Sequence, residues 1–128
     1  MQQIIDYFLE VQSYVKGLDI IETADIEYEV KARNLGIIHG MISFIDGSTV
    51  HFMELAHIRG EEINRLKYRF HWIDANAEMT FRYDNAPHHP EIGTYPHHKH
   101  RRGEEKPEES KEVGLIEILA EIKAAILG

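Results

Sequence analysis

Hydrophobic residues recur at helical spacing at both ends of the chain. Near the start they fall on one face of the segment 2–16, and Gly17 stands where a helix would end. These positions are Ile4, Phe8, Val11 and Val15. Near the end, apolar residues repeat with the same period over residues 112–127. We therefore predict an amphipathic helix at each end, and we expect the second one to fold onto the core of the protein.

Between these helices the hydrophobic period changes to two, which is typical of strands with one buried face. Short polar breaks such as Asp46-Gly47-Ser48 provide the turns, because glycine accepts a positive φ angle without steric cost. The segments with this pattern are 20–32, 35–45, 49–58, 66–73 and 79–84. Short connections favour pairing of successive strands. The sequence thus predicts an α+β fold with a five-stranded antiparallel meander sheet.

The segment 85–107 has no periodicity. It contains all four prolines and five of the nine histidines of the chain. A loop of this length in a compact protein is usually functional or disordered, and its histidines and Tyr95 argue against a plain linker. We therefore predict one domain over residues 1–128, with a long histidine-rich functional loop before the C-terminal helix.

Composition limits the classes of protein that remain. The chain has 128 residues, with 14 Lys and Arg against 22 Asp and Glu, which gives a net charge of −8 with histidines neutral. This excludes a globally basic nucleic-acid coat protein. There is no cysteine, which excludes disulfides and thiolate metal sites and fits a reducing cytoplasm. We see no signal peptide and no apolar stretch of 18 residues, so we expect no membrane segment.

The last two predicted strands concentrate charge on one face. With a turn at residues 74–77, cross-strand neighbours would lie about 5 Å apart. The expected pairs are Arg69 with Arg82, Lys67 with Asp84, and His71 with Thr80. Two opposed arginines repel each other unless an anion lies between them. The patch is therefore a candidate anion site, with a solvated outer face as the alternative.

The histidine-rich loop supplies groups that transfer protons near neutral pH. Together with arginine and lysine, these are the groups that RNA cleavage without a metal ion requires, because cations stabilise the charged phosphorane. The rival hypothesis is a metal site, in which two His-His pairs and His100 offer three or four imidazoles to Zn²⁺, Ni²⁺ or Cu²⁺. The spacing matches no established metal motif, so we assign no metal ligand and no cofactor from sequence and keep a divalent transition metal as the alternative.

Three motifs resemble the TumE family of toxin–antitoxin proteins. They are Lys67-Tyr68-Arg69-Phe70-His71-Trp72, Phe81-Arg82-Tyr83-Asp84-Asn85-Ala86-Pro87-His88-His89-Pro90 and Pro96-His97-His98-Lys99-His100. The resemblance is close over residues 66–100. It implies a small cytoplasmic toxin that is silenced by a helix-turn-helix antitoxin and that acts on RNA or on the translation machinery.

Residues and resemblance together give the working hypothesis of a toxin that is a metal-independent endoribonuclease. We expect His88 or His89 to act with His98 as base and acid, Arg82 to stabilise the phosphorane, and Asp84 to orient a histidine or Arg82. The residues expected to contact the substrate are Arg69, His71, Asn85, His97, Lys99, His100 and Arg101. The alternatives are a non-enzymatic inhibitor that binds RNA or the ribosome, and a metal-binding protein. The sequence leaves a homodimer open.

Overall fold

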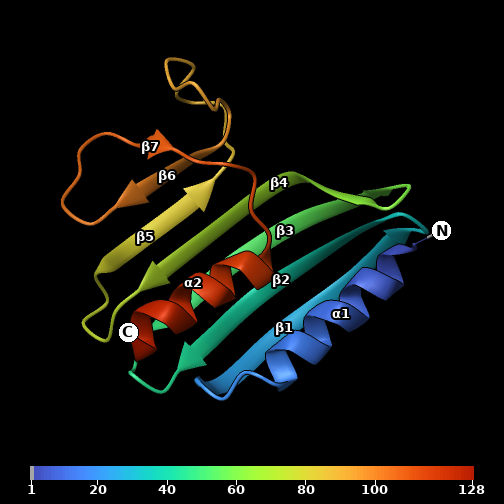
Figure 1. The fold of residues 1–128 in the computed structure, drawn as a ribbon, viewed down its shortest axis with the longest axis horizontal. Coiled ribbons are helices and arrows are strands. Elements are labelled where there is room, and N and C mark those ends of the chain that lie inside the picture. The colour runs from blue at the N-terminus through green and yellow to red at the C-terminus, as the bar shows by residue number, and fades with distance from the viewer. Residues whose placement is uncertain (1) are drawn as a thin grey trace.

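The computed structural model describes residues 2–128, within which the chain forms two helices and one seven-stranded sheet (Figure 1). The helices are α1 (Ile4–Lys16) and α2 (Leu115–Leu127). The strands are β1 (Ile21–Ala32), β2 (Leu35–Phe44), β3 (Thr49–Arg59), β4 (Glu62–Ile73), β5 (Met79–Asp84), β6 (His98–Arg101) and β7 (Glu108–Glu109). Each strand pairs antiparallel with its neighbours in sequence. Among these residues no helix is long and apolar enough to cross a membrane.

The predicted α+β class, both helices and the antiparallel meander are confirmed, but the number of strands is wrong. Strands β6 and β7 lie inside the segment 85–107 or just after it, which we expected to be irregular. Strand β6 escapes detection because its residues are all basic and show no apolar alternation. The polar side chains on both faces of β6 nevertheless have charged partners. Lys99 binds an acidic residue of α2, and His98 binds a carboxylate of β5.

Both helices pack on the same face of the sheet, and the core lies between them and the strands (Figure 1). This helix-covered face carries the alternating apolar residues of β2 to β5, for example Ile38, Phe70 and Tyr83. Helix α1 approaches β2 closely at Gly36, where a Cβ atom would lie 2.5 Å from the ring of Phe8. A glycine is therefore required beneath this helix.

The start of β4 departs from the predicted alternation. The alternation predicted over residues 66–73 would place Leu66 on the core face with Tyr68, but Leu66 is 54% exposed. The pairing of β3 with β4 shifts at this point, because Leu55 pairs with Lys67 and Ala56 pairs with Arg65. Leu66 is the extra residue of a β-bulge, and a bulge reverses the direction of the side chains that precede it. Arg65 consequently turns towards the core.

Arg65 joins a buried cluster that ties both helices to the sheet. The carboxylate of Glu54 accepts hydrogen bonds from the hydroxyl of Tyr7 on α1, from the backbone N–H of Leu115 on α2 (2.8 Å) and from Nε of Arg65 (3.5 Å). Glu54 is fully buried. Burial raises the pKa of the Tyr7 hydroxyl, and the charge of Glu54 raises it further. We call Glu54, Tyr7, Arg65 and the Leu115 amide the Glu54 cluster.

The opposite face of the sheet, which we call the open face, is not covered by either helix. Its charge changes sign across the strands. On β1 it carries the acidic residues Asp25, Glu27 and Glu29, which pair with open-face positions of β2. On β4 and β5 it carries the cations described below. The net negative charge of the chain is therefore compatible with a local cationic surface.

Candidate active site

Six polar residues on the open face of β4, β5 and β6 form two rows across the strands. The first row is Arg69, Asp84 and His98, and the second row is His71, Arg82 and His100. Side chains of directly paired residues lie on the same face of a sheet. We call these six residues the grid. All six are among the site residues predicted from the sequence.

The pairing within the grid differs from the prediction by two residues. We expected Arg69 opposite Arg82, but Arg69 pairs with Asp84 and Arg82 pairs with His71. The turn extends to Glu78, whose backbone N–H bonds Oδ1 of Asp74 at 3.1 Å, and a β-bulge follows between Trp72 and Ile73. Because the side-chain period of a strand is two, a shift of two residues keeps the same side chains on the same face. The predicted patch of charged side chains is therefore present on one face of the sheet, although the predicted cross-strand pairs are wrong.

Asp84 is the centre of the grid. Its Oδ1 atom lies 2.9 Å from Nε2 of His98 and accepts a hydrogen bond from the backbone N–H of Ala86 at 3.0 Å. Its Oδ2 atom accepts a hydrogen bond from Nε of Arg82 at 3.1 Å. The other ring nitrogen of His98, Nδ1, lies 2.9 Å from the carbonyl oxygen of Pro96. Asp84 therefore contacts both a histidine and Arg82, which the sequence analysis named as alternative partners.

A cleft of about 590 Å³ opens beside this carboxylate. It lies between β4, β5 and the start of the histidine-rich loop, and we call it the β4–β5 cleft. Its lining residues are Leu66, Lys67, Tyr68, Arg69, Arg82, Asp84, Asn85, Ala86, Pro87, His88 and His98. Asp84 is the only acidic residue among them, against three with positively charged side chains. The cleft is thus cationic and has the volume of a typical small-ligand pocket.

Arg69 also lines a second, smaller cavity of about 280 Å³ on the open face. This cavity is bordered by His51, Phe52, Met53 and His71. His51 pairs directly with His71. His51 is not among the predicted site residues, because a histidine on this strand is interpreted from sequence as a structural or surface residue. The two cavities share Arg69, so a cationic path runs from the β4–β5 cleft towards β3.

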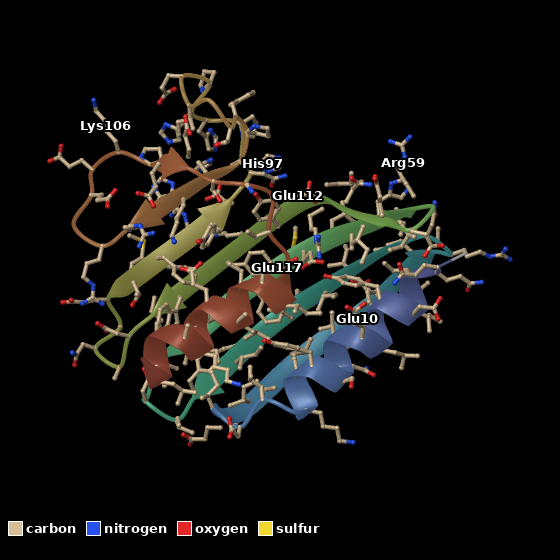
Figure 2. All side chains as sticks on the ribbon, viewed as in Figure 1. Glu10, Arg59, His97, Lys106, Glu112 and Glu117 are labelled. Atoms are coloured by element: carbon tan, nitrogen blue, oxygen red, sulfur yellow. The ribbon has the colours of Figure 1, made fainter. Side chains whose placement is uncertain are left out.

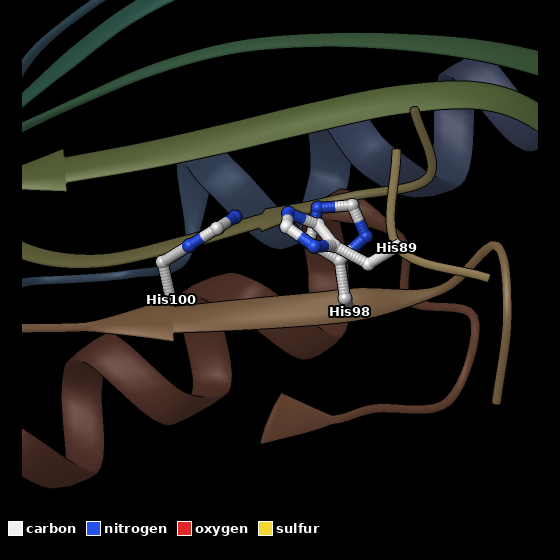
Figure 3. Close-up of side chains that lie close together, drawn as sticks. All are labelled: His89, His98 and His100. Carbon is white, nitrogen blue, oxygen red and sulfur yellow. The ribbon is translucent and has the colours of Figure 1, made fainter. Parts of the chain in front are cut away.

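The two histidines at the start of the loop occupy different positions. His88 is exposed and lines the β4–β5 cleft together with His98. His89 lies instead against β6, with its ring centre 5.2 Å from that of His98 and 6.0 Å from that of His100 (Figure 3). Rings in such close contact leave no room for a phosphate between them. Of the two predicted acid–base pairs, only His88 with His98 borders an open cavity.

Three predicted substrate contacts lie outside both the grid and the β4–β5 cleft. Lys99 and Arg101 alternate with the grid residues on β6, so they lie on the helix-covered face. There Nζ of Lys99 binds Glu121 at 3.1 Å, and Nε of Arg101 binds Glu108 at 2.6 Å. The period of two in β6, which we did not recognise as a strand, explains this difference.

The third of these residues is His97. Its ring stacks on Tyr68 with a centre-to-centre distance of 5.8 Å, and its Nδ1 atom lies 2.8 Å from the Tyr68 hydroxyl. Figure 2 shows His97 beside the segment that carries Glu112, at the border of the sheet. The His97 imidazole therefore contacts Tyr68 of β4 and does not line the cleft.

Asn85 lines the β4–β5 cleft but binds the backbone of β4 at both ends of its side-chain amide. Its Oδ1 accepts a hydrogen bond from the N–H of Tyr68, and its Nδ2 donates one to the carbonyl oxygen of Leu66, both at 3.0 Å. These are the backbone groups next to the β-bulge at Leu66. Asn85 thus fixes the wall of the cleft where regular strand pairing has ended.

The electrostatics of the grid favour neutral imidazoles at its second row. Burial lowers the pKa of His71, and the positive charges of Arg69 and Arg82 lower it further. Burial and Arg82 likewise lower the pKa of His100. Two neutral imidazoles beside guanidinium groups form a site that attracts anions and can accept protons.

The model of the family described as "Toxin TumE" matches residues 11–126. The α+β protein with this cationic surface and these clustered histidines is therefore a toxin of a toxin–antitoxin system. A toxin of this class has an antitoxin as its partner. The match covers nearly the whole chain, and the protein belongs to the TumE family of toxins. Neither a search of curated proteins nor a search of solved structures found a match.

Proposed function

We propose that this toxin is an endoribonuclease that cleaves RNA at the β4–β5 cleft without using a metal ion in the reaction. The observation that supports this most strongly is that one cationic cavity is lined by His88, by the Asp84–His98 pair and by Arg69 and Arg82. A proton acceptor, a proton donor and two cations are the groups that transfer of a phosphodiester to its own 2′-hydroxyl requires.

In the proposed reaction, His88 takes the proton of the 2′-hydroxyl while the oxygen forms a bond to phosphorus. The bond from phosphorus to the 5′-oxygen breaks, and this leaving oxygen takes the proton shared by Asp84 and His98. Arg69 and Arg82 stabilise the additional negative charge of the phosphorane. The products are a 2′,3′-cyclic phosphate and a 5′-hydroxyl end.

The path for the RNA follows from the charges of the open face. Arg69 borders both cavities, so a phosphate next to the scissile one would lie near His51 and His71. The acidic residues of β1 lie at the far edge of the sheet and oppose binding there. Attraction is therefore local, and we expect RNA affinity to fall steeply with salt concentration.

The experiment compares purified toxin and variants on an RNA and on the same RNA with one 2′-deoxy nucleotide at each mapped cut. The deoxy substitution should abolish that cut, because the nucleophile is missing. His88→Ala should slow cleavage by about 10²- to 10⁴-fold. The matched control is His39→Ala, which removes a histidine from β2 on the open face of the sheet.

Two results would overturn the proposal. One is cleavage by His88→Ala at the rate of His39→Ala. The other is tight RNA binding and growth arrest without any cut RNA, which would indicate a non-enzymatic inhibitor. The family resemblance further supports a helix-turn-helix antitoxin in the cytoplasm as the partner, and co-expression of such an antitoxin should suppress the cuts.

A further inference from the structure

Three imidazole rings converge on one point beside the β4–β5 cleft. His98 and His100 extend from β6, and His89 reaches them from the histidine-rich loop (Figure 3). One nitrogen of each ring lies within 4.8 Å of one nitrogen of the other two. We propose that His89, His98 and His100 bind a single divalent transition-metal ion of the Zn²⁺, Co²⁺ or Ni²⁺ class. Imidazole nitrogen is a preferred ligand of these ions.

The hydrogen bonds of two of these rings fix the nitrogen that faces the cluster. Nδ1 of His89 lies 3.1 Å from the carboxylate of Glu91, and Nδ1 of His98 lies 2.9 Å from the carbonyl oxygen of Pro96. A carboxylate and a carbonyl oxygen are acceptors, so each Nδ1 carries a hydrogen. Nε2 of His89 then holds the lone pair for a metal, whereas Nε2 of His98 binds a metal by giving up the proton that it shares with Oδ1 of Asp84. Metal-binding histidines typically donate their second N–H to such oxygens.

The third ring provides an independent indication. Nε2 of His100 is buried and has no hydrogen-bond partner. An unsatisfied buried polar atom is costly and requires an explanation. In Figure 3 the distal nitrogen of His100 points towards the rings of His89 and His98. A metal ion at their centre would satisfy it.

The rings must move closer together to surround an ion. Metal–nitrogen bonds of about 2.0–2.1 Å in a tetrahedral site place the ligand nitrogens about 3.3 Å apart, and the three nitrogens now lie within 4.8 Å of one another. Asp84 adds a negative oxygen beside the cluster, since its Oδ1 lies 2.9 Å from Nε2 of His98. Asp84 also binds Arg82 and so offsets part of the nearest guanidinium charge.

Metal binding and the proposed cleavage reaction both use His98, so they require two separate states of the protein. A metal on Nε2 of His98 would replace the proton that His98 shares with Asp84. It would also join the loop to β6 through His89. Binding of metal in the absence of RNA therefore tests the site without reference to the cleavage reaction.

The experiment uses the full-length protein after treatment with a chelator and buffer exchange, titrated with Co²⁺ alone and then with Zn²⁺. We expect one equivalent of Co²⁺ to bind with the intense visible absorption of a tetrahedral complex, and Zn²⁺ to displace it. His89→Ala and His100→Ala should each weaken binding about tenfold or more. The matched control is His97→Ala, which removes a histidine of the same segment whose ring binds Tyr68.

Each outcome decides the question. Stoichiometric binding that His89→Ala and His100→Ala weaken and His97→Ala leaves intact supports the site. Circular dichroism of every variant identifies any variant that has failed to fold. His89→Ala changes only a loop residue, so this variant keeps the test valid if His100→Ala unfolds. Binding of less than one equivalent, or equal weakening by all three variants, means adventitious chelation by a histidine-rich segment and overturns the proposal.

Discussion

The Glu54 cluster and the Asp84 centre of the grid are built from the same parts and differ in what surrounds them. Each is a buried carboxylate that accepts hydrogen bonds from an arginine, from a backbone N–H and from a ring side chain. Glu54 lies under both helices, whereas Asp84 borders a cleft of about 590 Å³. The ring partner of Glu54 is a tyrosine, and that of Asp84 is a histidine.

This comparison separates a structural network from a chemical one. Tyr7 has a pKa raised by burial, so it exchanges no proton near neutral pH. A histidine can do so, and the neighbouring cleft lets a substrate reach it. Access to solvent and the identity of the ring, rather than the buried carboxylate itself, therefore distinguish the two sites. The predictions below test this distinction, from the largest expected effect to the smallest.

Glu54→Ala should cause the largest loss of stability. It leaves the guanidinium of Arg65 buried without its partner and removes the acceptor for the Leu115 amide. Loss of one member of a buried ion pair costs about 3–5 kcal/mol of unfolding free energy. Denaturant unfolding measures this loss. Cleavage per folded molecule should stay at the level of the unaltered protein, and a folded but inactive variant would break the comparison.

Arg82→Gln should have the opposite profile. The variant loses the charge that faces the phosphorane, which we expect to slow RNA cleavage by about 10²- to 10³-fold. Its stability should change less than that of Glu54→Ala, because Arg82 is partly exposed and Asp84 keeps its contacts with His98 and with the backbone N–H of Ala86. The matched control is Arg59→Gln at the far end of β3, where the side chain projects from the β3–β4 hairpin (Figure 2). Equal rates in the two variants would remove Arg82 from the site.

Asn85→Ala tests whether the wall of the cleft depends on the side-chain amide. The change leaves the N–H of Tyr68 and the carbonyl oxygen of Leu66 without their partner, which costs about 1–3 kcal/mol. Thermal unfolding measures this loss, with the exposed turn residue Asn76 changed to alanine as the control. We also expect slower cleavage, because the loop that carries His88 starts here. An unchanged melting temperature would contradict this role.

The smallest predicted effect is a shift in the pKa of His71. Burial, Arg69 on its own strand, Arg82 on β5 and His51 on β3 all lower the pKa of His71 below its ordinary value of about 6.5. The folded chain thus binds less proton at His71 than the unfolded chain. Its contribution to stability is complete above the ordinary pKa and is lost as pH falls through the lowered one. Histidine NMR titration should show this shift.

The same titration in Arg82→Gln provides the control for the cause. Removing that positive charge should move the pKa of His71 back towards its ordinary value. An unchanged pKa in this variant would mean that Arg82 does not contribute to the shift, and that His71 and Arg82 within the second row of the grid are not coupled.

The period of the hydrophobic residues was sufficient to predict both helices, the five long strands and the face that carries the grid. It could not predict the positions of Lys99 and Arg101, because β6 contains no apolar residue whose period would reveal a strand. The face of these side chains is set by pairing with β5 and by Glu121 of α2. Such partners are distant in sequence and leave no local pattern.

The β-bulges explain the other failures. The bulge at Leu66 exposes a leucine and buries Arg65, and the one before Ile73 changes the register of the grid. A bulge depends on tertiary contacts such as those of Asn85, so hydrophobic spacing alone gives no sign of it. The convergence of His89 with His98 and His100 likewise depends on how the loop folds back over β6.

The most direct test of the account is the chemistry of the RNA ends that the toxin produces. Purified toxin, treated with chelator, is incubated with RNA, and the ends are mapped by selective ligation of 5′-hydroxyl and of 5′-phosphate termini. A reaction by the 2′-hydroxyl at the β4–β5 cleft predicts new 5′-hydroxyl and 2′,3′-cyclic phosphate ends that Arg82→Gln suppresses and Arg59→Gln does not. New 5′-phosphate ends, or no new ends at all, would contradict it.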